Sequence, residues 1–328
     1  MGKDSGIIEV KDKKYPEALK QALKKLQPHL GQKRLFYKGN WPVLSKAEGT
    51  CPEPAEGTCP EPAEGDDIFK NCLAVVGSRH LTSYGRRVTE QFVTEIAAAG
   101  VTIVSGFMYG GDEAAHSAAV KCRGRTIAVM PCGIDIIHPA NQKKLYQEIL
   151  DNNGLIISEY EGDTQPQNFT YVQRDRIIAG LSKAVLVTEA ALNSGSLITA
   201  GYGRKYGRKI FAIPGQITSE VSKGTIKLIK EGAEVATEAN DILSYFKVLV
   251  NPTKAKGLPM SPSWRTSGVP QTSSILEQKI IDQLKRESMK ADEMARCFSI
   301  PVAKIGTALS LMQLKGFINQ DNGKYYVN

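Results

Sequence analysis

The sequence predicts an α/β protein with a doubly wound, mostly parallel sheet, followed by a small C-terminal domain of the winged-helix type. Between residues 72 and 243, short apolar runs alternate with segments of helical composition at intervals of roughly 30 residues, which is typical of a parallel sheet covered by helices on both faces. From residue 275 onward, three helical patterns precede a hairpin that turns at Asp321, Asn322 and Gly323. This is the order of elements in a winged helix-turn-helix.

The expected strands are short apolar runs rich in β-branched residues, which favour a buried position in a parallel sheet. They are Leu73–Val76, Val101–Val104, Thr126–Met130, Leu155–Ile157, Ala184–Val187 and Ile210–Ile213. Helices are expected over Tyr84–Ala99, Glu113–Lys121, Gln142–Leu150, Tyr171–Leu181 and Leu197–Tyr206. Strand and helix therefore alternate throughout the central part of the chain.

The chain is expected to divide into five segments. A perfect duplication of AEGTCPEP occupies 47–54 and 55–62, and its Pro, Glu and Gly content predicts a disordered insertion because it cannot bury apolar surface. A later stretch with four Pro and no regular period predicts a linker. The segments are an N-terminal appendage at 1–46, the repeat insertion at 47–68, the doubly wound domain at 69–247, the linker at 248–270 and the winged helix at 271–328.

The net charge is +8, from 42 basic and 34 acidic residues in a chain of 328. Because this excess is spread along the chain, nucleic-acid binding would depend on placed cations in a pocket rather than on a broad positive face. No apolar run approaches the length of a membrane span and the first residues lack a signal-peptide core, so a cytoplasmic protein is expected. The six Cys form no CxxC pair and the four His are scattered, so no metal site or disulfide framework is expected.

In a doubly wound sheet, ligands bind outside the carboxyl ends of the strands, near the point where the strand order reverses. We call the residues that follow the expected strands the rim, and they are rich in Gly, Ser and Thr: 77–79, 105–112, 131–135, 158–160, 188–196 and 214–216. Gly77 permits a tight turn, Ser78 supplies a hydroxyl donor, and Arg79 supplies a planar group that suits phosphate oxygens. An ordinary turn with a surface arginine is the alternative. The recurrence of similar turns favours an anion-binding rim beside helix N-termini.

Acid–base chemistry has one candidate pair on the rim. Asp112 and His116 lie one helical turn apart, where they could act as an acid–base pair or could cap and orient the start of a helix. Glu189 is a further rim carboxylate. The sequence contains no dinucleotide-binding GxGxxG motif, no P-loop and no nucleophile elbow. No catalytic residue, cofactor or metal is therefore expected.

Further cations lie near the rim. Arg174 and Arg176 are at the head of an expected helix, where one guanidinium is expected to face the rim and the other to pair with Asp175 or Glu189. Lys144 follows a His-Pro turn and could add a cation at a helix start. In the winged helix, cations are few (Lys304, Lys315 and Lys324), so contact with protein or a vestigial role is as plausible as DNA binding.

The motifs, taken together and in order, resemble those of the DprA/Smf family of DNA-processing proteins. The resemblance covers residues 72 to 240 closely, and the appendage and the winged-helix tail fit the same family. It implies an extended Rossmann domain that binds single-stranded DNA without catalysis, forms a homodimer, protects incoming DNA and helps load RecA recombinase during natural transformation. The motifs are VVGSR, SG…GDEAAH, TIAVMPCGID, HPAN, GLIISE, RDRIIAGLS, SGSLITA, FAIPGQ and GTIKLIKEGA.

The resemblance also implies which residues contact DNA. Ser78 and Arg79 are expected to contact phosphate, with a basic pocket extended from Arg174, Arg176 and Lys144. A helix start lines the same pocket. The full expected set is Gly77, Ser78, Arg79, Ser105, Gly106, Lys144, Arg174, Arg176, Ser194, Gly195, Ser196 and Thr199, with Phe107, Tyr109 and Phe169 as candidates for base stacking.

The sequence departs from the family at two points. The family usually reads SGLARGID where this chain has SGFMYGGD at 105–112, so Tyr109 replaces a basic residue, and it reads RNR where Asp175 stands here. These changes bear on base preference and affinity.

Two other functions are alternatives to DNA binding by the rim. One is a phosphoribohydrolase-like enzyme acting on nucleoside monophosphates, which is expected to carry PGGxGTxxE; the corresponding segment 193–199 has no Glu at that spacing. The other is a transcription regulator that binds duplex DNA through residues 271–328. The weak basicity of this segment argues against it.

Overall fold

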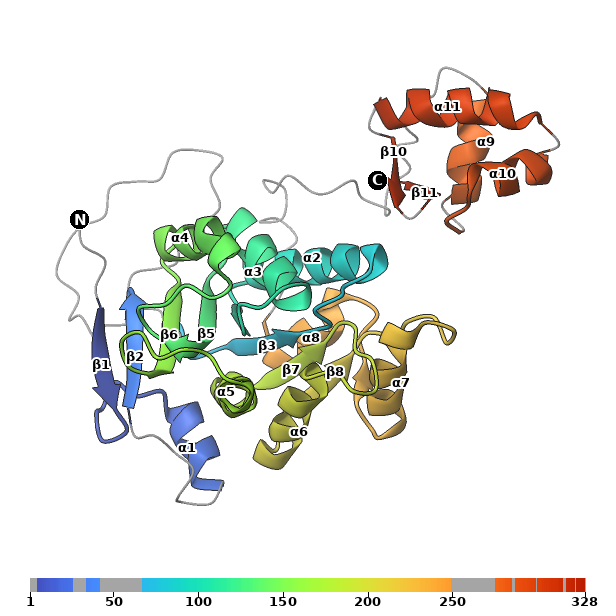
Figure 1. The fold of residues 1–328 in the computed structure, drawn as a ribbon. Coiled ribbons are helices and arrows are strands. Elements are labelled where there is room, and N and C mark those ends of the chain that lie inside the picture. Colours follow the sequence, from blue (N-terminus) through green and yellow to red (C-terminus); the bar gives the residue numbers. More distant parts are fainter. Residues whose placement is uncertain are drawn as a thin grey trace. The chain divides into compact units, whose positions relative to one another are not determined.

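The computed structural model describes residues 5–25, 34–41, 67–248, 275–284, 287–298, 300–314, 317–321 and 323–327. The chain divides into two compact units, residues 1–258 and 259–328 (Figure 1). The predicted repeat insertion and linker lie outside the described residues, apart from Asp67, Ile68 and Val248. None of the helices within the described ranges is long and apolar enough to cross a lipid bilayer.

The first unit is built on a sheet that contains nine strands among the described residues, in the order β1-β2-β6-β5-β4-β3-β7-β8-β9. The strands from β6 to β9 in this order run parallel, and β1 and β2 are antiparallel additions at one edge. Their bounds are β1 Ser5–Glu9, β2 Arg34–Gly39, β3 Cys72–Val76, β4 Thr102–Ser105, β5 Thr126–Gly133, β6 Leu155–Tyr160, β7 Ala184–Val187, β8 Lys209–Ala212 and β9 Glu234–Val235. The predicted α/β fold with a mostly parallel sheet is confirmed.

The strand order reverses at β3. From β3 the chain proceeds through β4 and β5 to β6 on one side, and then returns to place β7 on the other side of β3. The residues after β3 and β7 therefore emerge side by side. This is the topological switch point at which doubly wound proteins bind ligands.

Helices cover both faces of the sheet (Figure 1). One face packs against α1, α5, α6 and α7, and the other against α2, α3, α4 and α8. Alternate residues of each inner strand face the two cores, so Leu73 and Val75 pack on one side while Ala74 and Val76 pack on the other. The helices are α1 Glu17–Lys25, α2 Ser83–Ala98, α3 Gly111–Lys121, α4 Lys143–Asp151, α5 Asn168–Leu181, α6 Ser196–Tyr206, α7 Lys223–Lys230 and α8 Ala239–Phe246, with short 3₁₀ turns at Ala140–Gln142 and Glu220–Ser222.

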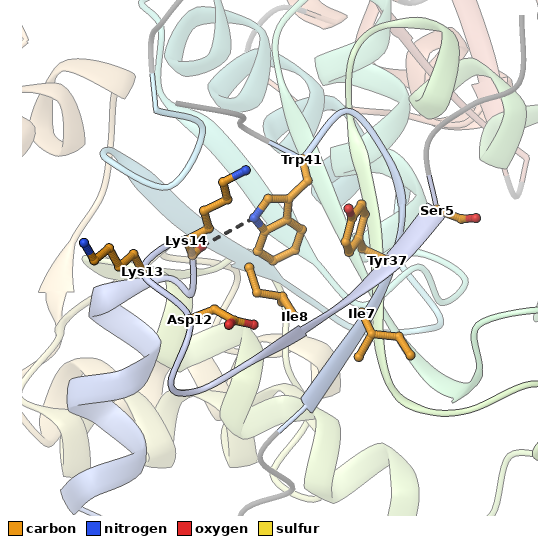
Figure 2. A pocket seen from close by; sticks show the side chains of 8 residues that line it. All are labelled: Ser5, Ile7, Ile8, Asp12, Lys13, Lys14, Tyr37 and Trp41. Atoms are coloured by element: carbon orange, nitrogen blue, oxygen red, sulfur yellow. Dashed lines mark hydrogen bonds between the residues drawn. The ribbon is translucent and has the colours of Figure 1, made fainter. Parts of the chain in front are cut away.

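The N-terminal appendage extends the sheet and shares its core. Strand β2 pairs with β6, so that Phe36 lies opposite Ser158, and the buried Leu19 of α1 packs against Gly180 of α5. The hollow in Figure 2 lies over the antiparallel β1–β2 pair, where the Trp41 indole N–H donates to the Lys14 carbonyl oxygen at 3.3 Å. None of the predicted DNA-contacting residues lines it. The appendage therefore covers α5 from outside.

The second unit contains α9 Ile275–Leu284, α10 Ala291–Phe298 and α11 Val302–Leu314, followed by the hairpin strands β10 Ile318–Asp321 and β11 Lys324–Val327. Its core is formed by apolar side chains from all three helices and β10, among them Ile280, Met294, Ile305 and Leu309. This element order confirms the predicted winged-helix domain. On α11, Val302 and Leu311 are about half exposed.

Candidate nucleic-acid interface

Backbone hydrogen bonds fix the turn that follows β3, and the side chain of Arg79 in this turn is exposed to solvent. Ser78 N–H donates to the Glu189 carbonyl oxygen at 2.8 Å, and Gly111 N–H donates to the Ser78 carbonyl oxygen at 3.0 Å. These bonds tie the turn to the residues after β7 and to the start of α3. Arg79 is exposed, and among the described residues it has no ion pair. Its guanidinium carbon lies 5.1 Å from the centre of the Tyr171 ring.

Two glycines allow three segments to meet at this point. A Cβ on Gly111 would lie 2.6 Å from the Gly77 Cα, and a Cβ on Gly77 would lie 2.5 Å from the Thr188 Oγ1. Real Cβ atoms do not approach other heavy atoms this closely. The start of α3 can therefore touch the turn only if residue 111 lacks a side chain, and Thr188 can pack against the turn only if residue 77 lacks one.

Replacing Gly111 by alanine is expected to lower the free energy of unfolding by about 1–3 kcal/mol, because the new methyl group forces α3 away from the backbone of Gly77. Urea unfolding followed by circular dichroism measures this loss. Gly201→Ala is the matched control, since Gly201 lies within α6 with no atom within 4 Å of its Cβ. That control should leave the free energy of unfolding unchanged or raise it; an equal loss in both variants would contradict the steric explanation.

The residues after β4 support the rim from behind. Ser105 is fully buried and its hydroxyl donates to the Val75 carbonyl oxygen at 2.6 Å. Phe107 is also fully buried, with φ of 59°, and packs near His116 and Tyr146. The prediction that Phe107 stacks on bases is wrong in this structure, because the left-handed backbone turns its ring into the core. Neither Ser105 nor Phe107 is open to a ligand.

The two arginines of α5 are buried, and neither guanidinium faces solvent. Arg174 Nη1 donates to the carbonyl oxygens of Gly106 and Val129, and its Nε lies 3.1 Å from the Asp175 carboxylate. Arg176 forms a buried ion pair with Glu159 of β6. The expectation that one guanidinium lies at the rim surface is corrected. The reason is that α1 and α6 both pack on α5. Of the two expected pairing partners, Asp175 and Glu189, Asp175 pairs with Arg174 and Glu189 does not pair with either arginine.

Glu189 instead caps the helix that follows the Gly77–Arg79 turn. Its side chain is 3% exposed and accepts hydrogen bonds from the Thr82 N–H at 2.9 Å and from the Thr82 hydroxyl at 2.5 Å. Thr82 in turn is the N-cap of α2, accepting from Gly85 N–H. The residues after β7 thus fix both the turn and the helix beyond it.

Asp112 and His116 do not form a hydrogen-bonded pair. Asp112 accepts from the Met108 N–H at 3.3 Å, near the start of α3, so the capping alternative describes it better. His116 Nδ1 lies 2.8 Å from the Thr126 hydroxyl, which itself donates to the Ile103 carbonyl oxygen. Nδ1 therefore carries the hydrogen in a neutral ring. Burial, with a smaller contribution from Arg174, lowers the pKa of His116 to about 3, so it does not act as a base near neutral pH.

Helix α6 begins at Ser196, nine residues after the end of β7, which pairs with β3 at the switch point. Ser194 and Gly195 are accessible, while Ser196 and Thr199 are buried. The hydroxyls of Ser194 and Ser196 lie 2.8 Å apart, and the Ser194 hydroxyl also accepts a hydrogen bond from the Ser196 N–H at 3.4 Å. The N–H groups of Ser194, Leu197 and Ile198 donate to carbonyl oxygens within this segment, so the attraction for an anion comes chiefly from the positive end of the helix dipole.

Lys144 is a separate, solvated cation. Its side chain is 90% exposed and lies 3.7 Å from Glu148 within α4. A pair this exposed is weak and leaves the ammonium group able to attract an anion.

Aromatic side chains also lie at the rim. Tyr109 and Phe169 are about half exposed, and the Tyr109 hydroxyl donates to Asn141 at 3.1 Å. Tyr171 and His138 were not anticipated; Tyr171 lies beneath the Arg79 guanidinium, and its hydroxyl is 2.8 Å from His138 Nε2. The only sequence signal for Tyr171 was its position three residues before Arg174. A rim that joins a free arginine to aromatic faces suits a polyanion with exposed bases.

The fold is that of a Rossmann-like α/β protein followed by a small domain of three helices and a hairpin, with a glycine- and serine-rich rim at the switch point of the sheet. The model of the family described as DNA recombination-mediator protein A matches residues 64–247, more than half of the chain. This chain belongs to that family.

Relatives and solved structures agree with this assignment. Protein Smf of Escherichia coli K12 is 37% identical over 255 residues, covering 77% of this chain and 67% of the relative. The X-ray structure of DNA processing protein A from Streptococcus pneumoniae matches with a TM-score of 0.60 at 35% identity, covering 73% of each chain. DNA processing protein A from Helicobacter pylori, whose structure is described for its single-stranded-DNA-binding mode, matches with a TM-score of 0.58 at 27% identity, covering 74% of this chain and 96% of that one.

Proposed function

We propose that this chain is a single-stranded-DNA-binding recombination mediator that acts without catalysing a reaction, and that it protects incoming DNA and helps load RecA during natural transformation. The observation that carries the proposal is Arg79, an exposed guanidinium without an ion pair among the described residues, held at the switch point of the sheet. The H. pylori relative with a single-stranded-DNA-binding mode supports the choice of ligand.

The DNA backbone is proposed to contact two adjacent parts of the rim. Phosphates would accept hydrogen bonds from Arg79 and from the N–H of the exposed Gly195, and Lys144 would add a more distant charge. Ser78 is buried and adjoins Arg79, so its hydroxyl would reach a phosphate only at the edge of the turn. Tyr109, Phe169 and Tyr171 offer faces on which bases can stack. The remaining members of the expected set act from behind as supports: Gly77, which is partly exposed, and the buried Ser105, Gly106, Arg174, Arg176, Ser196 and Thr199.

Further parts of the proposal concern the rest of the protein. Residues 69–247 are assigned as the DNA-binding domain and residues 271–328 as the winged helix, in a cytoplasmic homodimer. Helix α11 carries a single cation, Lys304, while its exposed positions include Val302 and Leu311. This composition suits contact with a protein better than contact with a duplex phosphate backbone.

Fluorescence anisotropy with labelled oligo(dT) of about 30 nucleotides, long enough for several binding sites of this kind, tests the proposal against a duplex of equal length. We expect preference for the single strand and a linear fall of log affinity with log salt, with a slope of about −0.7 for each phosphate contacted. The DNA should be recovered intact after incubation with Mg²⁺. Absence of binding to either nucleic acid at low salt would refute the proposed function.

A further inference from the structure

We propose that Asp175 positions Arg174 and the start of α6 beneath the rim, and that its carboxylate takes up a proton when DNA binds. This inference rests on the proposed function and adds a titratable positioning residue to it.

Asp175 connects the two sides of the switch point. Its carboxylate lies 3.1 Å from Arg174 Nε and accepts a hydrogen bond from the Thr199 hydroxyl, in the first turns of α6. The Arg174 guanidinium continues the connection by donating to the carbonyl oxygen of Gly106, after β4, and to that of Val129, in β5. One buried carboxylate thereby links the loop on the β4 side to the helix that follows β7.

The buried charges around Asp175 do not balance. The charged groups that act on it are Arg174 on its own helix and Asp112 on α3, and α6 contributes the uncharged Thr199 hydroxyl. Arg174 and Asp112 approach each other closely enough that a Cβ on Gly106 would meet both. His116 is the next titratable group near Arg174 and is neutral. With both carboxylates ionised, the buried groups carry one positive and two negative charges, and the exposed Arg79 acts on Asp112 from the surface.

Because of this charge imbalance, the Asp175 carboxyl can take up a proton beneath the surface that is proposed to bind phosphate. Burial raises the pKa of the Asp175 carboxyl to about 6; Arg174 opposes the rise and Asp112 adds to it. Burial likewise raises the pKa of Asp112, against the opposing charge of Arg174. Within this cluster, protonation of Asp175 removes the excess negative charge. A neutral cluster repels DNA phosphate less than an anionic one.

The sign of the linkage follows from these charges. A bound phosphate disfavours the ionised carboxylate, so the pKa of Asp175 is higher in the complex than in free protein. Affinity is then greatest below the free-state pKa near 6 and falls as pH rises through the higher pKa of the complex. If DNA raises that pKa by about one unit, the two limits of affinity differ by about tenfold.

The experiment is oligo(dT) binding by the full chain between about pH 5 and pH 8 at constant ionic strength, for wild type and Asp175→Asn. Asparagine keeps an oxygen that accepts from Arg174 and Thr199, and it carries no charge. We expect wild-type affinity to fall about tenfold across this range, and the variant to hold close to the wild-type affinity at low pH throughout. His138→Gln is the control for titration of a rim histidine, and it should retain most of the fall.

Thr199→Val gives a second test, which distinguishes a titrating Asp175 from one that has only a structural role. Removing the hydroxyl that stabilises the ionised carboxylate should move the midpoint of the pH profile upward, whereas general loosening of the rim would lower affinity equally at every pH. Calorimetry at pH 6.5 in two buffers of different ionisation enthalpy should show proton uptake by wild type and none by Asp175→Asn. A wild-type pH profile retained in Asp175→Asn would overturn this inference alone. Failure of the wild type to bind DNA at any pH would refute the proposed function and the inference with it.

Discussion

Replacing Arg79 by alanine is expected to weaken oligo(dT) binding by about 10- to 100-fold, the effect of losing one charged hydrogen-bonding group of about 1.5–3 kcal/mol. The side chain is exposed and has no ion pair among the described residues, so its whole hydrogen-bonding capacity is open to phosphate. For the same reason the melting temperature should change little. Anisotropy titrations and thermal unfolding of the same preparations measure both quantities.

Two matched variants separate a specific contact from general electrostatics. Arg123→Ala removes the same charge from an exposed position that precedes β5, at the opposite edge of the sheet. It should reduce affinity no more than about twofold at physiological salt, where the Debye length is about 8 Å. Arg79→Lys keeps the charge without the planar fork and should be intermediate. Equal losses in Arg79→Ala and Arg123→Ala would exclude the rim as the binding site.

The fold could be predicted because its signals are local. Each inner strand is a short apolar run bounded by small or polar residues, and the alternation with helices implies a parallel sheet whose carboxyl ends share one edge. This alternation is enough to predict that the Gly77–Arg79 turn lies at the carboxyl end of the sheet. The order of the strands could not be predicted, because it depends on how the crossover helices pack. The pairing of β2 with β6 could not be predicted either, because no apolar pattern in the sequence indicates it.

The accessibility of individual rim residues could not be predicted. Arg174 and Arg176 have the composition of a basic patch, but α1 and α6 cover the helix that carries them, and three acceptors from distant strands enclose their guanidinium groups. Phe107 is turned inward by one positive φ angle. Tyr171 became a candidate only through its position under Arg79. In each instance the deciding contact joins residues far apart in the sequence.

Replacing Arg176 by methionine is expected to lower the free energy of unfolding by about 3–5 kcal/mol, the usual loss when one member of a buried ion pair is removed. Arg176 and Glu159 are each at most 5% exposed, and the pair joins α5 to β6 next to Tyr15 of the appendage. Urea unfolding measures the loss. If Arg176 instead contacted DNA from an accessible position, the variant would lose affinity while keeping wild-type stability.

The pH dependence of this loss identifies its cause. Burial raises the pKa of Glu159, and Arg176 opposes that rise. Without the guanidinium the folded-state pKa rises further above its unfolded value. The carboxyl then destabilises the fold increasingly as pH rises above the unfolded pKa, where the unfolded chain releases the proton that the folded carboxyl retains. The stability deficit of Arg176→Met should therefore be largest near pH 8 and shrink toward pH 5. The double variant Arg176→Met with Glu159→Gln also removes the carboxylate that has lost its partner. It should recover part of the lost stability at pH 8 and show no pH dependence of the remaining loss. If the loss in Arg176→Met alone is instead constant with pH, its cause is lost packing of the arginine stem.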